Sequence, residues 1–418
     1  MQGSKVAVKL RQKIANFSGE LSRGLPKAAG RFVAEMIYGV QARQSVLLTE
    51  VARSLEEPTT IKKTEERLSR QLGRHGLGEV IQHNVLAKAS KKVKDDTLLI
   101  IDLSDIRKRY ARKMQYLARV RDGSEGQLAD GYWVCSVVGA EVERNGIVPM
   151  YQRLYSAEAP DFISENDELL RCVDTICGYV GHRGIWVMDR GGDRGDLLRP
   201  FLDRPVRFLI RLVGDRHLIF AGKPRVTREL AKDCPCLYSE TIIKEDKGKE
   251  QVFHLDFGFR KVFLPGREEQ LYLLVVKGLG NEPLMLLTNV ALRRSRKLLW
   301  NMVRGYFRRW AIEESIRFWK HSYDVENIRV LGYRSLQNMM PLVLAVSYFA
   351  AIVLDIGSKL RVSAAHVLKA AKRVFGIPEF HYYAIADGLR SIFLRHPGKP
   401  YRLFWPKLPQ QSLQLQLL

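Results

Sequence analysis

The spacing of apolar residues divides the chain into stretches with different periods. Residues 1 to about 95 carry apolar side chains three and four positions apart, as in Phe32 and Met36, which is typical of amphipathic helices. A turn at Glu56-Glu57-Pro58 precedes another helical stretch over about 60–72, which Gly73 ends. The pattern predicts a helical N-terminal domain over residues 1–95.

Two compact apolar runs further along each lead into an aspartate. Leu98 to Ile101 precedes Asp102, and Ile185 to Met188 precedes Asp189, and both runs are typical of buried central strands. Strand-like and helical stretches alternate around them, at 132–140, 147–154, 164–179, 195–202 and 207–211. We therefore predict that residues 96–213 form the first part of an α/β core.

The helical period is absent from the next stretch and then returns. Short β-like runs separated by turns predict a β-rich insertion over residues 214–290, and helical spacing then predicts the second part of the core over 291–360. A helix over 364–375 and an irregular proline-containing tail are expected within 361–418. The apolar run from Met339 to Leu354 is shorter than the roughly 20 residues that span a bilayer, so it predicts a buried core helix and no membrane partner.

The charge balance points to a polyanionic partner. The 418 residues include 68 Lys and Arg against 45 Asp and Glu, a formal net charge of +23, and nucleic acid is the leading candidate. A generally basic soluble protein is the alternative. The basic residues Lys62, Lys63 and Arg67 on the helix over 60–72 fit a helix-turn-helix DNA reader and a solvated helix pair equally well.

The cysteines favour a reducing, intracellular environment. There are five, an odd and scattered set, and the one close pair, Cys234 and Cys236, has no second pair or histidine cluster at zinc-ligand spacing. A zinc-dependent module around this pair remains the rival interpretation from another class.

The two strand-end aspartates suggest a cation site. A carboxylate at the end of a buried strand is costly unless something compensates its charge, and two such strands point to a shared ion. Mg²⁺ prefers hard oxygen ligands, and two such ions support phosphoryl transfer. The alternative, that Asp102 and Asp189 are strand-end turns or helix caps, is about as plausible from these residues alone.

The stretch from Tyr306 to Lys320 carries a third carboxylate among cations. On a continuous helix, Tyr306, Arg309, Glu313 and Lys320 would lie within roughly 60° of one another. A carboxylate flanked by groups that grip phosphates fits a metal-dependent nuclease centre. A solvated helix face with ion pairs at four-residue spacing is the alternative.

This stretch resembles a known family. Tyr306-x2-Arg309-x3-Glu313-x6-Lys320 matches the YREK signature of bacterial insertion-sequence transposases with a DDE active site. The resemblance to this family extends over roughly residues 95–350. Asp102 sits where the family's first aspartate follows an apolar strand, and Asp189-Arg190-Gly191 with Asp193 is similar to its second block. The resemblance implies a ribonuclease-H-like catalytic core with the β-rich insertion before the glutamate, and an α-helical N-terminal domain that binds DNA.

The resemblance also implies a chemistry and partners. Asp102, Asp189 and Glu313 would be catalytic and would bind two Mg²⁺ ions per active site, with Mn²⁺ as a substitute. Water would nick one strand at the element's end, and the freed 3′-hydroxyl would attack the opposite strand to close a hairpin. Hydrolysis would reopen the hairpin, and the same 3′-hydroxyl would then join target DNA. The implied partners are double-stranded DNA, as terminal inverted repeats and target, and a second copy in a synaptic homodimer. The implied location is the bacterial cytoplasm, at the nucleoid.

The expected DNA contacts follow partly from this resemblance and partly from local charge. Tyr306, Arg309 and Lys320 would hold phosphates, and a flipped base would stack on Trp300 or Trp310, although both could equally be core residues. The remaining expected contacts are basic: Arg107, Lys108, Arg109, Arg112, Lys113, Arg190, Lys62, Lys63 and Arg67. Two rivals keep the same ancestry, a non-catalytic DNA-binding protein derived from a transposase and a ribonuclease-H-fold nuclease or resolvase without strand transfer.

Overall fold

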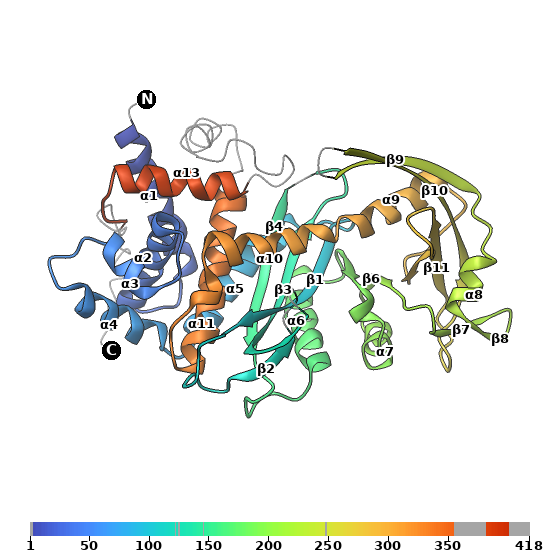
Figure 1. The fold of residues 1–418 in the computed structure, drawn as a ribbon, viewed down its shortest axis with the longest axis horizontal. Coiled ribbons are helices and arrows are strands. Elements are labelled where there is room, and N and C mark those ends of the chain that lie inside the picture. Colours follow the sequence, from blue (N-terminus) through green and yellow to red (C-terminus); the bar gives the residue numbers. More distant parts are fainter. Residues whose placement is uncertain are drawn as a thin grey trace, which may run out of the picture.

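The computed structural model describes residues 3–121, 123, 126–144, 146–246, 249–354 and 382–400. Within these ranges, helices gather at one end of the molecule and a curved sheet extends to the other (Figure 1). The helix expected over 364–375 and the tail beyond residue 400 lie outside the described residues.

The N-terminal stretch is helical, as its spacing predicts. Its elements are α1 (Gly3–Leu21), α2 (Lys27–Arg43), α3 (Leu48–Ser54), α4 (Ile61–Leu72), α5 (Leu77–Ala89) and the short η1 (Ser90–Lys92). The Thr60 side chain caps α4 by accepting a hydrogen bond from the backbone of Lys63.

These helices share their packing with later helices. The chain returns to them in α11 (Tyr333–Tyr348), its extension η4 (Phe349–Val353) and α13 (Tyr382–Arg395). Buried amides fasten the two sets, because Asn338 donates to the Leu72 carbonyl at 2.6 Å and Gln41 donates to the Val346 carbonyl at 3.1 Å. The N-terminal helices therefore pack against residues from the later part of the chain, including α11 and η4, which the sequence had assigned to the second part of the core.

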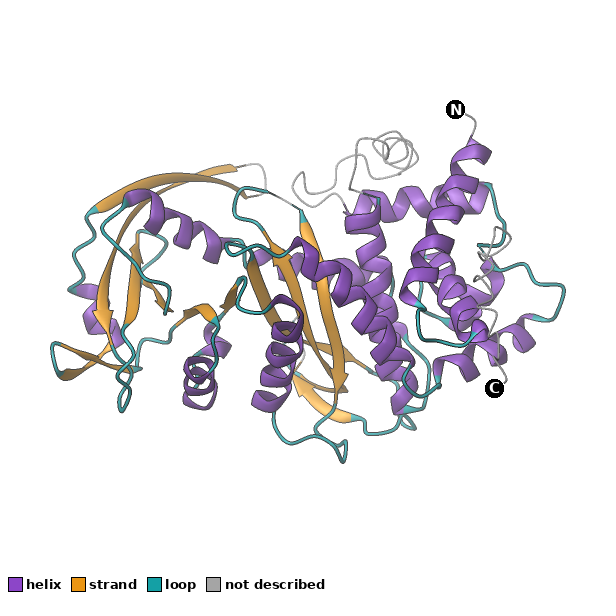
Figure 2. Ribbon diagram, turned by 180° about the vertical axis from the view of Figure 1, so that it is seen from behind, coloured by secondary structure: helices purple, strands orange, loops and turns teal. Residues whose placement is uncertain are grey.

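The centre of the molecule is a mixed sheet. Its strands are β1 (Leu98–Arg107), β2 (Ala118–Arg121), β3 (Leu128–Ala140), β4 (Ile147–Tyr155), β5 (Ile185–Met188) and β6 (Arg207–Arg211). The strands β1, β5 and β6 run parallel, whereas β3 is antiparallel to both β1 and β4. Helix α6 (Glu165–Val180) covers one face, followed in the chain by α7 (Gly195–Asp203) (Figure 2).

The β-rich stretch predicted over 214–290 is present, and most of it continues the same sheet. Strand β12 (Leu284–Thr288) pairs antiparallel with β6, and β11 (Leu271–Lys277), β10 (Lys249–Val262) and β9 (Tyr238–Asp246) follow in order outward. A separate hairpin of β7 (His217–Phe220) and β8 (Lys223–Val226) leads into α8 (Thr227–Lys232). The insertion thus extends the core sheet at its β6 edge.

The stretch from 296 to 322 forms two helices where one was expected. These are α9 (Arg296–Phe307) and α10 (Trp310–Ser322), followed by η3 (Val325–Asn327). At the junction the amides of Arg309 and Ala311 bond three residues back, to Tyr306 and Arg308, which tightens the chain into a turn of 3₁₀ type. Tyr306 and Glu313 therefore lie on different helices.

One helix among the described residues is long and apolar enough to cross a membrane. It covers Tyr333–Val353, and 83% of its most apolar stretch is buried within the protein. This burial confirms the prediction of a core helix for the apolar run that begins near Met339.

Candidate active site

Asp102 and Asp189 lie level with each other on neighbouring strands. Strand β5 pairs with β1 in parallel from Leu98 opposite Ile185 to Ile100 opposite Val187. Continued by two residues, this register places Asp102 opposite Asp189, where the two strands part. Strand β1 continues past Asp102 to Arg107, so Asp102 lies within its strand and not at its end as the sequence predicted, but the shared register still brings both aspartates to the same place.

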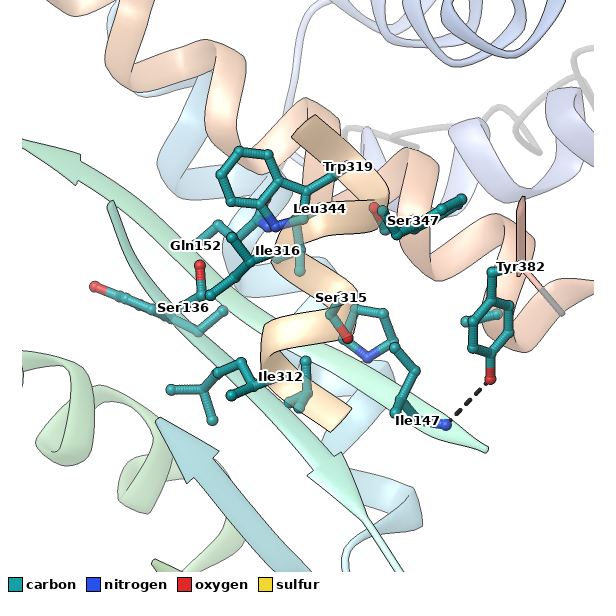
Figure 3. A pocket seen from close by; sticks show the side chains of 16 residues that line it. Ser136, Ile147, Gln152, Ile312, Ser315, Ile316, Trp319, Leu344, Ser347 and Tyr382 are labelled. Atoms are coloured by element: carbon teal, nitrogen blue, oxygen red, sulfur yellow. Dashed lines mark hydrogen bonds between the residues drawn. The ribbon is translucent and has the colours of Figure 1, made fainter. Parts of the chain in front are cut away.

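Helix α10 lies across the face of the sheet that carries Asp102. Ser136 on β3 is the direct partner of Asp102, so both side chains point to the same face. Ser136 also lines a cavity of about 20 Å³ together with Ile312, Ser315 and Trp319 of α10 (Figure 3). The neighbouring residue Glu313 is in the first turn of the helix.

Arg309 connects two of the three carboxylates. Its Nη2 lies 2.5 Å from Glu313 Oε1, and its Nη1 lies 3.9 Å from Asp102 Oδ2. The Arg309 side chain is only 12% exposed, and its Nε has no hydrogen-bond partner within the described residues. A buried guanidinium therefore neutralises part of the carboxylate charge, and its Nε is buried without a partner among the described residues.

Asp102 is the carboxylate whose ionisation the site changes most. Burial, followed by the nearby charge of Asp189, raises the pKa of Asp102 to about 7, against the lowering effect of Arg309 and of the Leu103 amide, which donates to Oδ1 at 2.9 Å. Asp189 Oδ1 accepts a hydrogen bond of 2.7 Å from the amide of Gly191. The two aspartates thus face each other in a setting where a cation would favour the charged form of both.

The donor chemistry of the three side chains suits Mg²⁺, which prefers carboxylate oxygens. As they stand, no three His, Cys, Asp or Glu side chains in the described part of the chain are grouped closely enough to hold a metal ion. The reason at this site is visible in the geometry, since Glu313 pairs with Arg309 instead of approaching the aspartates. Asp102 and Asp189 are brought together, and Glu313 reaches them through Arg309.

Of the other two residues of the signature, Tyr306 is buried and Lys320 is half-buried and paired with two carboxylates outside the candidate triad. Tyr306 is 6% exposed, and burial raises the pKa of its hydroxyl despite the nearby Arg309 and Arg211. Lys320 Nζ lies 3.1 Å from Glu326 Oε1 and 3.4 Å from Asp105 Oδ1. Sequence reasoning missed these carboxylate partners, because neither follows the spacing of the signature.

Lys108 is not a DNA contact, contrary to the sequence prediction. Its side chain is buried, and its Nζ donates to the carbonyls of Glu326 at 2.6 Å and Ile328 at 2.7 Å. Burial lowers the pKa of Lys108 to about 8. The ammonium therefore fastens the end of β1 to the segment after α10.

Arg67, another predicted DNA contact, is paired with two carboxylates of the protein. It donates to the fully buried carboxylate of Glu35 at 2.7 Å and to Glu57 at 3.2 Å, and it joins α4 to α2. The other two basic residues predicted on α4, Lys62 and Lys63, are exposed. These two lysines remain available to a ligand.

The two tryptophans separate into a packed one and an exposed one. Trp300 stacks on Phe257 with ring centroids 5.6 Å apart, and it is a partly buried residue that packs α9 against β10. Trp310 is 62% exposed at the start of α10, one residue from Arg309. Of the two aromatic candidates for a flipped base, Trp310 is the one placed to meet a ligand.

The other predicted basic contacts lie at the surface. Exposed side chains are those of Arg109, Arg112, Lys113 and Arg190, and Arg107 is half-buried. Asp193, the last residue of the second aspartate block, is instead buried, where it pairs with Arg216 and accepts the Val213 amide at 2.6 Å. It therefore holds the loop after β6 in place.

Comparison with known proteins gives a likeness among solved structures. No protein-family model matches the chain, and no curated protein matches it. Among solved structures, the chain is similar to a piggyBac transposase, determined by cryo-EM as a synaptic complex with hairpin DNA. The sequence identity is 10%, the match covers 97% of this chain and 83% of that chain, and the TM-score is 0.46.

Proposed function

We propose that this protein is a DNA transposase of the DDE type, with Asp102, Asp189 and Glu313 as its catalytic carboxylates. The observation that carries the proposal is the position of Asp102, within β1, level with Asp189, which directly follows the adjacent parallel strand β5, with Arg309 bridging Asp102 to Glu313. The YREK spacing and the net charge of +23 support the same assignment.

The three carboxylates would hold Mg²⁺, with Mn²⁺ as a substitute, at two ions per active site. When bound, these ions would supply activation of the attacking oxygen and stabilisation of the leaving oxygen in phosphodiester transfer. The mixed sheet with carboxylates on β1 and β5 supports a ribonuclease-H-like core, and the exposed lysines of α4 support DNA binding by the N-terminal helices.

The remaining residues of the signature would act on the DNA backbone. Arg309 has a planar, permanently charged group that suits phosphate as well as carboxylate. Lys320 would supply a second cation, and exposed Trp310 would stack on a base displaced beside the cut. Of these side chains, Arg309 contacts two of the carboxylates, whereas Lys320 contacts Asp105 and Glu326.

The reaction proposed is excision followed by strand transfer. A nick at the element's end frees a 3′-hydroxyl, which attacks the opposite strand to close a hairpin; hydrolysis reopens it, and the same hydroxyl joins target DNA. Two copies would act together, each on DNA held partly by the other. Cytoplasmic action on chromosomal DNA goes with this function.

The test is to separate binding from cutting at Glu313. We expect Glu313→Gln to bind the element's terminal repeat with wild-type affinity and to lose Mg²⁺-dependent cleavage, because the amide keeps the shape and loses the charge. Glu314→Gln is the matched control, since Glu314 is paired with Arg317 on the same helix and should leave cleavage intact. Cleavage retained by Glu313→Gln would remove Glu313 from the catalytic centre.

A further inference from the structure

A basic groove lies beyond the carboxylates, where strand β1 ends. Residues 107–114 form one wall and residues 324–331, which follow α10, form the other, around a volume of about 740 Å³. Six basic side chains line it against two carboxylates, those of Asp324 and Glu326. Glu326 is paired with Lys320, and Asp324 accepts a hydrogen bond from Asn327 at 3.0 Å. The groove therefore favours an anionic ligand.

The wall that carries the basic residues is held in place by a buried ammonium. Lys108 Nζ donates to two carbonyls of the opposite wall, and its backbone amide donates to the Asp130 carbonyl at 2.6 Å. Burying an ammonium is costly unless it is fully hydrogen-bonded, so these bonds fix the two walls relative to each other. The groove is thus formed before a ligand arrives.

An aromatic ring projects from this fixed wall. Tyr110 is 93% exposed, so the protein covers almost none of its surface. It lies between Arg109 and Arg112, whose side chains are exposed as well. Cations that follow a phosphate backbone, interleaved with an aromatic ring, are the combination that binds single-stranded nucleic acid, because every base can stack on such a ring. In a continuous duplex the bases already stack on each other, and the ring would gain little.

The groove is also in line with the cut. Five residues of β1 separate Asp102 from Arg107, about 17 Å at the rise of an extended strand. That span equals about five base pairs at 3.4 Å each. Lys320 lies between Asp102 and the groove, since it contacts both Asp105 of β1 and Glu326 of the groove wall.

We propose that this groove binds an unpaired stretch of DNA near the cleavage site, with Tyr110 stacking on a base while Arg112 and Lys113 contact the backbone. This inference rests on the proposed function, and it adds to it the kind of DNA structure that the enzyme holds. It gives Tyr110 a binding role distinct from that proposed for Trp310, which is the first residue of α10 and precedes Glu313 by three residues.

The experiment measures binding without cleavage. A fluorescein-labelled 20-nucleotide single strand and the matching duplex are titrated with wild type, Tyr110→Ala and Tyr110→Phe in EDTA, by fluorescence polarisation. We expect Tyr110→Ala to weaken single-strand binding about tenfold and duplex binding less than twofold, and Tyr110→Phe to restore both. Lys113→Ala should weaken both and lower the salt dependence by about one counterion.

Two results would overturn the inference. Unchanged single-strand affinity in Tyr110→Ala would remove the ring from the DNA, and an equal loss on both probes would assign the groove to duplex. Either result leaves the proposed function standing. If the wild type bound neither probe, the proposed function would fail together with this inference. Because Tyr110 is exposed, equal melting temperatures of the variants would show that folding is not the cause.

Discussion

The change of Arg67 to methionine separates a structural arginine from a DNA contact. Methionine keeps an unbranched stem and removes the guanidinium that bridges Glu35 of α2 and Glu57. The side chain of Glu35 is completely buried, so the loss leaves a buried carboxylate with one partner fewer. Arg31 still donates to the other oxygen of Glu35, at 2.6 Å.

The expected cost follows from these contacts. Removing one partner of a buried ion pair costs about 3–5 kcal/mol, and a hydrogen bond to a charged group contributes about 1.5–3 kcal/mol. Since Arg31 remains and Arg67 is partly exposed, we expect the lower end, about 3 kcal/mol. For a large domain this lowers the melting temperature by about 6 °C or more.

The assay is thermal unfolding followed by circular dichroism, together with DNA binding by fluorescence polarisation. Lys62→Met is the matched control on the same helix, because Lys62 is exposed; it should leave the melting temperature unchanged and weaken DNA binding. The reasoning is refuted if Arg67→Met melts within 1 °C of the wild type and weakens DNA binding as much as the control does.

Four further predictions concern the candidate site. The pKa of Asp102 is raised to about 7, so a metal ion must displace a proton from Asp102 below that pH. The Mn²⁺ affinity measured by calorimetry should therefore rise up to tenfold per pH unit below pH 7 and level off above it. An affinity that does not change with pH would contradict the assignment of Asp102 as a metal ligand. In the metal-free protein the same shift means that stability is lost as the pH rises from about 4 to about 7, since the native state keeps a proton on Asp102 that the unfolded chain has released. In denaturant titrations, Asp102→Asn should remove this pH dependence of the free energy of unfolding. Lys320→Ala should slow cleavage of labelled ends at least tenfold while the melting temperature changes little, and an unchanged rate would return Lys320 to a structural role. Trp310→Ala should reduce hairpin formation without a change in melting temperature, whereas Trp300→Ala should lower the melting temperature, and the reverse pattern would exchange their roles.

The sequence predicts the strands of this fold well where a single pattern decides the outcome. The two apolar runs before Asp102 and Asp189 are too uniform to be surface strands, and both are central. The β-like runs over 214–290 also form strands. Their attachment to the core was not predictable, because the pairing of β12 with β6 depends on edges that only the folded chain brings together.

The site was predicted in its residues more than in its contacts. Spacing placed Tyr306 and Glu313 on one stripe, but the tight turn at Arg308 divides that stripe between two helices. Charge alone made Lys108 and Arg67 resemble DNA contacts, because sequence does not show which cations are enclosed by carbonyls or carboxylates. For the same reason the position of Arg309 between two carboxylates became visible only in three dimensions.

The measurement that tests the central claim most directly is cleavage of a labelled duplex that carries the element's own terminal repeat. Wild type is compared with Asp189→Asn and with Asp196→Asn, an exposed aspartate seven residues further on, in Mg²⁺ and in EDTA. We predict nicks and hairpins with wild type and Asp196→Asn in Mg²⁺, and none with Asp189→Asn or in EDTA. Specific binding of the repeat by wild type without any cut would contradict the account and identify a non-catalytic DNA-binding protein.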